Sequence, residues 1–173
     1  MNDNITEAEL QVKMAKYLLP FFFVESEVWS TDGKKRIDLV IIHRSDVDKK
    51  YPIGIEIKKD DKKRGKQLAC WLKQATIYSE KEFKGYGKCM IITCPQVSGY
   101  YLREGEFMNQ HDFEEGYEHD NNIATFLSEF NIGEFQKYTR NSVTLGRIAY
   151  KGQIIWDRKE DSFRPHNYSR LCK

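Results

Sequence analysis

Hydrophobic side chains recur at helical spacing in two segments of this chain. Residues 6–19 carry apolar side chains every three or four positions, and Thr6 can cap the start of a helix that Pro20 would end. Residues 62–81 repeat this pattern, contain no proline and lack a run of β-branched residues. We therefore expect one helix near the N-terminus and a second helix in the middle of the chain.

Other segments have the alternation, or the continuous apolar character, that is typical of β-strands. They are residues 21–29, 36–43, 51–58 and 88–93. In the third segment, Ile53, Ile55 and Ile57 share one face of the expected strand, whereas Glu56 and Lys58 share the other. The first 95 residues are thus expected to run in the order helix, three strands, helix, strand.

The pattern weakens after Pro95. Residues 96–122 are polar and are expected to form a long connection, residues 123–138 a helix interrupted near Gly133, and residues 143–156 a hairpin that turns at Lys151-Gly152. A chain of 173 residues has room for one domain. We expect residues 1–95 to form its core and residues 96–173 a C-terminal extension packed on the same domain.

Composition narrows the class of protein only slightly. The chain is 40% hydrophobic and 31% charged, as is usual for a globular protein rather than a disordered one. The longest apolar stretch, residues 17–24, contains Pro20 and is far shorter than the roughly 20 residues of a membrane span. The N-terminus lacks the basic and apolar regions of a secretory signal. We therefore expect a cytoplasmic protein with no membrane partner.

One acidic residue followed two positions later by lysine stands out by its context. The pattern acid-x-Lys begins at Asp32, Asp48, Glu56, Asp60, Asp61, Glu82 and Asp157. Only Glu56-Ile57-Lys58 lies among alternating isoleucines, and only Asp38 interrupts another apolar strand, residues 37–42. Charged side chains are rarely buried unless they are paired or bind a metal. The alternative is that this face of the strand is simply exposed to solvent.

Two carboxylates on adjacent strands would supply the hard oxygen ligands that Mg²⁺ prefers. A lysine two residues beyond one of them projects from the same face of its strand. It can hold the attacking water or neutralise the charge that develops on a phosphate. Asp38, Glu56 and Lys58 are therefore candidate catalytic residues for hydrolysis of a phosphodiester.

Arg36-Ile37-Asp38, followed by Gly54-Ile55-Glu56-Ile57-Lys58 and then by a helix and a strand, resembles the PD-(D/E)xK nuclease superfamily over about residues 5–95. Ile37 stands where that superfamily has its proline. The resemblance implies an α/β fold with a restriction-endonuclease-like αβββαβ core, in which helices flank a mixed central sheet. It also implies DNA as the substrate, Mg²⁺ or Mn²⁺ as the cofactor, and it allows a homodimer, because many relatives cut as dimers.

Two further segments resemble particular branches of that superfamily. Glu7-Ala8-Glu9-Leu10 is similar to the first helix of archaeal Holliday-junction resolvases and RecB-like relatives, where a glutamate completes the metal site, and we favour Glu7 over Glu9. Both glutamates could instead complement the helix dipole. Gln74-Ala75-Thr76-Ile77-Tyr78 is similar to the Gln-x-x-x-Tyr motif of RecB-like and phage-exonuclease branches. Gln67-x-x-x-Trp71 has the same spacing, and Trp71 and Tyr78 can equally be core aromatics.

Basic residues directly follow the acid-x-Lys motif. They are Lys59, Lys62, Lys63, Arg64 and Lys66. A second basic set, from Arg158 onward, lies in the C-terminal tail. Such runs are usually solvated surface, but their position favours contacts with a phosphate backbone. The formal net charge of +2 neither requires nor excludes a polyanionic partner.

The residues thus predict a DNA endo- or exonuclease. The alternative is a catalytically inactive protein of the nuclease fold that binds nucleic acid or another protein, since a fold does not fix a function. The sequence leaves open whether the substrate is linear, single-stranded or branched DNA, or RNA.

Overall fold

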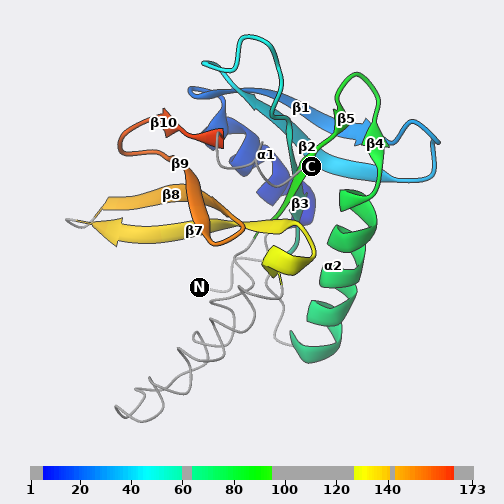
Figure 1. Ribbon diagram of the computed structural model, residues 1–173. Coiled ribbons are helices and arrows are strands. Elements are labelled where there is room, and N and C mark those ends of the chain that lie inside the picture. Colours follow the sequence, from blue (N-terminus) through cyan, green and yellow to red (C-terminus); the bar gives the residue numbers. More distant parts are fainter. Residues whose placement is uncertain (1–5, 60–63, 95–126, 141–142, 166–173) are drawn as a thin grey trace.

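The computed structural model describes residues 6–59, 64–94, 127–140 and 143–165, of which 64–68, 137–140 and 143–144 are described by their backbone alone (Figure 1). Both expected helices are present, α1 (Glu7–Leu18) and α2 (Arg64–Ser79). A capping box starts α1: the Thr6 hydroxyl accepts a hydrogen bond from the Glu9 amide, and the Glu9 carboxylate accepts one from the Thr6 amide. None of the helices in the described part of the chain has the length and apolar content needed to cross a membrane.

The described strands form one large mixed sheet and one small hairpin. They are β1 (Phe22–Trp29), β2 (Arg36–His43), β3 (Ile53–Ile57), β4 (Glu82–Phe83), β5 (Gly87–Lys88), β6 (Met90–Cys94), β7 (Ile132–Arg140), β8 (Val143–Tyr150), β9 (Gln153–Asp157) and β10 (Ser162–Phe163). The sheet has the order β1-β2-β3-β6-β7-β8-β9-β10, in which β3, β6 and β7 are parallel and all other neighbours antiparallel. The protein is therefore mixed α/β, and its four expected N-terminal strands are confirmed.

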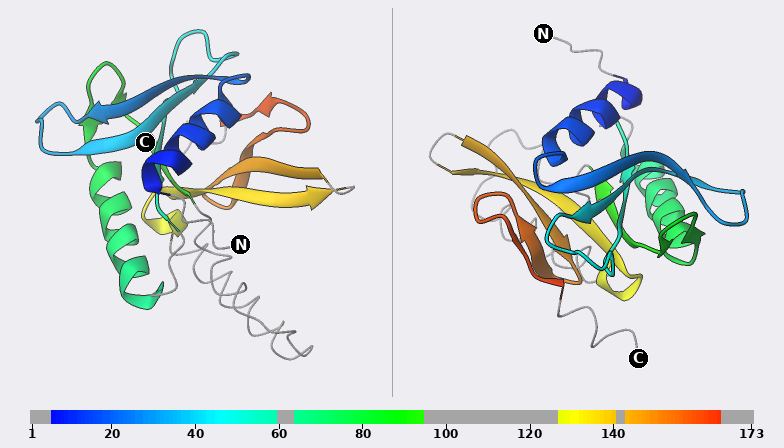
Figure 2. Two further views of the ribbon diagram at one scale, coloured as in Figure 1. Left: turned by 180° about the vertical axis from the view of Figure 1, so that it is seen from behind. Right: turned by 90° about the horizontal axis from the view of Figure 1, so that it is seen from above.

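Two hydrophobic clusters cover the two faces of the sheet, with one helix on each (Figure 2). Helix α1 contributes Leu18 to the first cluster, which also contains Ile55 of β3. Helix α2 contributes Tyr78 to the second, which contains Ile91 of β6. Strands β3 and β6 thus have a helix on both sides, which is why their sequences are almost wholly apolar.

The helix expected over residues 123–138 is wrong for its greater part. Residues 127–129 are helical, but β7 begins at Ile132, and residues 123–126 lie outside the described chain. Ile132 and Phe135 have helical spacing, yet the two residues between them are also buried, so β7 shows no alternation. A Cβ on Gly133 would lie 2.4 Å from the carbonyl oxygen of Ala149, so the close approach of β8 requires glycine there.

The expected hairpin at residues 143–156 is confirmed. Strands β8 and β9 pair across Lys151 and Gly152, whose φ angles of 50° and 72° are those of a type I′ turn. Because β7 pairs with β6, these C-terminal strands continue the sheet of the first 94 residues. The polar connection expected over residues 96–122 lies outside the described residues.

Candidate active site

The candidate site lies where β2 separates from β3. The two strands pair only from Leu39 to Ile41 on β2, opposite Ile53 to Ile55 on β3. Beyond this point β3 continues beside β6, while Asp38 reaches across the opening. Its Oδ2 accepts a hydrogen bond of 2.7 Å from the amide of Ile57. The carboxylate of Asp38 is therefore held at the end of β3, by the residue that follows Glu56.

Glu56 is buried, with only 3% of its surface exposed. One carboxylate oxygen, Oε1, lies 2.6 Å from the Nζ of Lys58. The other, Oε2, has no hydrogen-bond partner among the residues that the structure describes. The possibility that this face of β3 is exposed to solvent is therefore wrong. A buried carboxylate oxygen without a partner costs stability, so its retention calls for an explanation outside folding.

Burial and interactions with neighbouring charges shift the pKa values of Asp38, Glu56 and Lys58. Burial, followed by the negative charge of Asp38, raises the pKa of Glu56 to about 7, against the opposing effect of Lys58. Burial also raises the pKa of Asp38, although the Ile57 amide partly offsets it. Burial lowers the pKa of Lys58, but the hydrogen bond to Glu56 and the nearby carboxylates outweigh it, so the net shift is upward. Lys58 is consequently a cation at neutral pH.

Glu7, and not Glu9, is the N-terminal glutamate that the fold brings to this group. Its Oε1 accepts a hydrogen bond of 3.2 Å from the amide of Lys59, and its charge helps to raise the pKa of both Asp38 and Glu56. The Glu9 carboxylate is instead occupied by the capping box with Thr6.

Gln11 is a positioning residue that the sequence analysis missed. Its side-chain amide donates a hydrogen bond of 2.8 Å to the carbonyl oxygen of Asp38. Gln11 follows Glu7 by four positions, so both side chains project from one face of α1. That spacing is the signal by which Gln11 could have been found.

Gln74 and Tyr78 lie together on α2 and reach the backbone of β2. The Gln74 amide donates a hydrogen bond of 2.8 Å to the Tyr78 hydroxyl, which donates one of 2.8 Å to the carbonyl oxygen of Arg36. Burial, the largest influence, raises the pKa of Tyr78, and the charges of Glu56 and Asp38 add to the rise. The pair therefore borders the site and supports β2 two residues before Asp38, while Trp71 belongs to the core.

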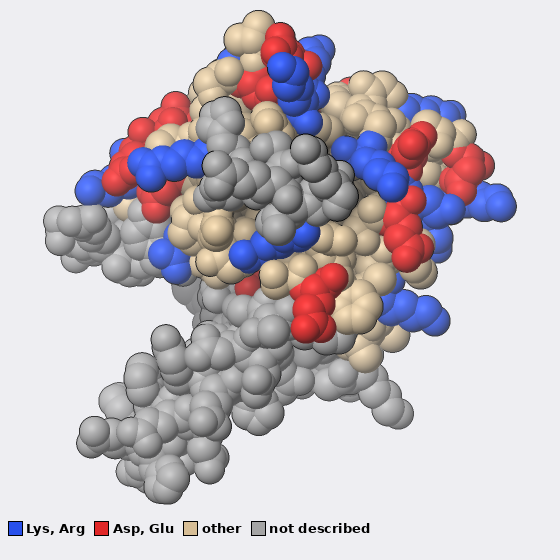
Figure 3. All heavy atoms as spheres, in the orientation of Figure 1, with Lys and Arg blue, Asp and Glu red and all other residues tan. Residues whose placement is uncertain are grey.

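The structure describes only part of the predicted phosphate-binding stretch. Lys59 is half-buried, Lys62 and Lys63 lie outside the described residues, and Arg64 and Lys66 are described by their backbone in α2. Figure 3 shows acidic and basic side chains interspersed over the described residues of one face. In the tail, the Arg158 guanidinium stacks 4.2 Å above the Tyr17 ring, which gives it a packing role. Phosphate contacts by this stretch stay a prediction.

The carboxylates of this site are its candidate metal ligands. In the described ranges there is no group of three or more histidine, cysteine, aspartate or glutamate side chains arranged to hold a metal. Mg²⁺ often takes only one or two protein carboxylates and completes its shell with water and substrate phosphate. Asp38 and Glu56, whose Oε2 has no hydrogen-bond partner in the described part of the chain, fit such a site. Their carboxylates could hold Mg²⁺ or Mn²⁺, with Glu7 nearby.

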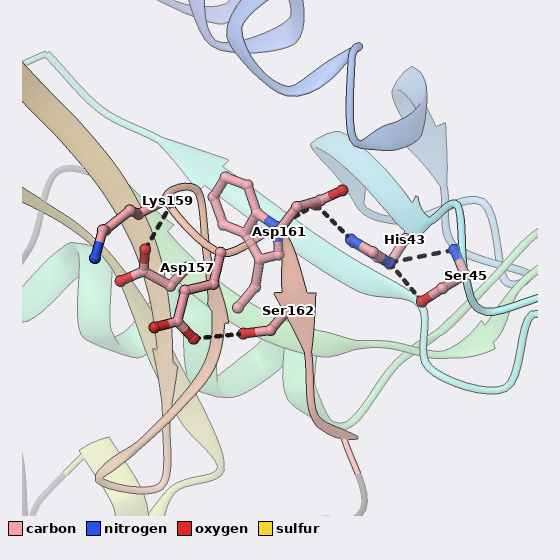
Figure 4. Close-up of polar contacts among 8 residues, drawn as sticks. His43, Ser45, Asp157, Lys159, Asp161 and Ser162 are labelled. Carbon is pink, nitrogen blue, oxygen red and sulfur yellow. Dashed lines mark hydrogen bonds and ion pairs between the residues drawn. The ribbon is translucent and has the colours of Figure 1, made fainter.

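A second polar cluster, around the buried His43 at the far end of β2, has the composition of a catalytic triad (Figure 4). The ring of His43 lies between Ser45, whose Oγ is 2.7 Å from Nδ1, and Asp161, whose Oδ1 is 3.0 Å from Nε2. The Ser45 amide also donates to Nδ1. In a hydrolase triad the serine contacts Nε2 and the aspartate Nδ1, so the arrangement here is reversed. We assign it a structural role, joining β10 to β2.

Comparison with known proteins gives no match to this chain among family models, curated proteins or solved structures. The case for a function therefore depends on the residues of the site and on their geometry.

Proposed function

We propose that this protein is a metal-dependent nuclease that hydrolyses phosphodiester bonds of DNA with Mg²⁺ or Mn²⁺. The observation that carries the proposal is the burial of Glu56 beside the half-buried Asp38 and Lys58 where β2 and β3 separate, with no hydrogen-bond partner for Glu56 Oε2 among the described residues. Such a group weakens the fold unless a cation and a substrate use it. Functional sites are where charges of this kind are retained.

The order of elements supports the same proposal. Helix α1, strands β1 to β3, helix α2 and strand β6 follow one another as αβββαβ, with the candidate residues on β2 and β3. This order is the one expected of a restriction-endonuclease-like core. Glu7 on α1, and Gln74 and Tyr78 on α2, contact the backbone near Asp38 and Glu56, which supports giving them the roles that the resemblance to RecB-like and resolvase-like branches implies.

In the proposed reaction, the carboxylates of Asp38 and Glu56 would hold the divalent ion, with the assistance of Glu7. The bound ion would act as a Lewis acid on the phosphate and would favour ionisation of water. Lys58 has three N–H donors, one of which is directed to Glu56. The remaining donors can orient the attacking water or contact a phosphate oxygen, where a positive charge stabilises the transition state. The Ile57 amide fixes Asp38, and Gln11 and Tyr78 fix the backbone of β2.

The test combines a substrate panel with a binding measurement. The protein is incubated with linear, circular, single-stranded and branched DNA, and with RNA, in the presence of Mg²⁺, Mn²⁺ or EDTA. We expect cleavage of at least one DNA with either metal and none with EDTA. Calorimetry should show Mn²⁺ binding that Asp38→Ala removes.

Two results would contradict the proposal. One is equal Mn²⁺ affinity in wild type and Asp38→Ala, which would mean that the paired carboxylates do not hold the ion. The other is an absence of cleavage for every nucleic acid with both metals. That second result would favour the alternative of a non-catalytic binding module on the same fold.

A further inference from the structure

An exposed tryptophan lies at the end of the β1–β2 hairpin, beside the candidate site. Trp29 is 46% exposed, whereas Trp71 and Trp156, the other two tryptophans of the chain, are 8% and 0% exposed. The guanidinium carbon of Arg36 lies 5.7 Å from the centre of the Trp29 ring, within the range of a cation–π contact. Arg36 also pairs with Glu27, whose Oε2 lies 3.2 Å from its Nη1.

The backbone around Trp29 is held on both sides. Trp29 pairs with Arg36 across the hairpin, and its carbonyl oxygen accepts a hydrogen bond of 2.9 Å from the amide of Lys84. The next residue, Ser30, is fully buried and bridges to Phe83. Trp29 therefore presents its ring from a fixed backbone, which lowers the conformational entropy lost when a ligand binds.

The strand partner of this tryptophan, Arg36, lies close to Asp38. Arg36 precedes Asp38 by two residues of strand, about 7 Å along β2, and its positive charge lowers the pKa of Asp38 against the larger effect of burial. The carbonyl oxygen of Arg36 also accepts a hydrogen bond from the Tyr78 hydroxyl. That spacing is about two base steps of a nucleic-acid strand, at 3.4 Å each.

We propose that Trp29 and Arg36 form a stacking site for an unpaired base of the strand whose phosphodiester bond lies at Asp38 and Glu56. The inference rests on the proposed function and adds to it a substrate class, nucleic acid with a single-stranded segment. The indole ring would stack on the base, and the guanidinium would supply positive charge to a neighbouring phosphate. Stacking of this kind tolerates any base, because each has an aromatic face.

The opposite end of the same hairpin provides a matched control. Phe23 is also exposed and also has an arginine above its ring, with the guanidinium carbon of Arg44 at 4.7 Å. Phe23 precedes Trp29 by six residues, about 20 Å along β1. A general affinity of exposed aromatic–arginine pairs for nucleic acid would involve both pairs equally, whereas the proposed site involves only the pair beside Asp38.

Tryptophan fluorescence tests the proposal directly, because Trp29 is the exposed one of the three. Wild-type protein is mixed with an oligothymidylate, a blunt duplex of equal length or inorganic polyphosphate, with Mn²⁺ present, and emission is followed by stopped flow before cleavage. We expect the oligothymidylate to quench the emission strongly and Trp29→Phe to abolish the quenching. Equal quenching by the duplex or by polyphosphate would overturn the proposal, since neither offers an unpaired base.

Affinity for the oligothymidylate gives the second measurement. We expect Trp29→Ala to weaken binding roughly 10-fold or more, and Trp29→Phe, which keeps a ring, to weaken it much less. Phe23→Ala should bind as wild type does, and all variants should melt within a few degrees of it. Wild-type affinity in Trp29→Ala would overturn the stacking site.

The two proposals can fail separately. Cleavage of DNA without quenching of Trp29 would reject the stacking site and leave the nuclease intact. Quenching that depends on Trp29, without cleavage of any substrate, would reject the nuclease and retain the binding site.

Discussion

Strand β2 carries a polar cluster near each of its ends, and each cluster surrounds one buried ionisable side chain. At one end, the buried Glu56 lies near the half-buried Asp38, and Glu56 Oε2 has no partner among the described residues. At the other end, both ring nitrogens of His43 are paired, with Ser45 and Asp161, and Asp161 also accepts from the Trp156 indole at 3.3 Å. Aromatic rings enclose His43 further, since Phe163 stacks on it with centroids 4.8 Å apart.

The cluster around His43 stabilises the fold, whereas the cluster around Glu56 lowers its stability. Hydrogen bonds that satisfy buried polar atoms contribute to stability, whereas an unpaired buried carboxylate costs stability. Removing His43 should therefore damage folding more than chemistry. Removing Lys58 should damage chemistry more than folding. The composition of serine, histidine and aspartate, by itself more suggestive of an enzyme, belongs to the structural cluster.

The largest effect is expected from Lys58→Ala on DNA cleavage. Loss of one group that stabilises transition-state charge typically lowers the rate ~10²–10³-fold. Mn²⁺ affinity, measured by calorimetry, should change little, because the lysine is not a ligand. Lys50→Ala is the matched control, since Asp48-Lys49-Lys50 repeats the motif with an ion pair of 2.7 Å whose side chains are 63% and 65% exposed. Equal cleavage by both variants would remove Lys58 from the proposed mechanism.

The next effect is expected from His43→Ala on stability. The substitution removes two partly buried hydrogen bonds and the packing on Phe163, which together should lower the free energy of unfolding by about 2–4 kcal/mol. Thermal denaturation should show a Tm lower by roughly 5–10 °C. The variant, tested well below its Tm, should still cleave DNA. A folded His43→Ala protein that has lost cleavage would overturn the structural assignment.

A smaller effect is expected from the pH dependence of stability in metal-free protein. The pKa of Glu56 is about 7 in the folded state against an ordinary value of 4.5. Between these values the unfolded chain is ionised while the folded protein holds the proton, so the free energy of unfolding should fall as pH rises from 4.5 to 7. We expect a fall on the order of 1–3 kcal/mol, obtained as the difference between wild type and Glu56→Gln in chemical denaturation.

Divalent metal should reverse this trend. In the proposed site Mn²⁺ would bind the ionised carboxylates, so it should stabilise wild type more at pH 7.5 than at pH 5, and Glu56→Gln much less at either pH. Identical stability profiles against pH for wild type and Glu56→Gln in EDTA would show that folding does not raise the pKa of Glu56.

The smallest effect is expected from Ser45→Ala. The exposed hydroxyl is one of two Ser45 donors near His43 Nδ1, and the backbone amide, 3.2 Å away, remains. The free energy of unfolding should fall by less than about 1 kcal/mol. A loss as large as that of His43→Ala, in the same denaturation assay, would mean that the hydroxyl alone holds the histidine ring.

The sequence by itself determined the N-terminal elements and singled out Glu56 and Lys58 as candidate site residues. The helical period of residues 6–19 and the alternation of Ile53, Ile55 and Ile57 follow from local geometry, because one buried face per element is imprinted on the residue spacing. Glu56-Ile57-Lys58 could be separated from six similar motifs for the same reason. The turn at Lys151-Gly152 was equally local, since its residue types match the backbone angles that it needs.

Only the tertiary structure decided the rest. Residues 132–135 of β7 are buried one after another, so the sequence carries no alternation there, and the predicted helix was wrong over this segment. Glu7, which the sequence only favoured over Glu9, contacts the site because the amide of Lys59, 52 residues along the chain, lies beside it. The pairing of His43 with Asp161 spans 118 residues. Contacts over such separations are set by how the sheet brings distant strands together, and no local pattern of hydrophobic spacing records that arrangement.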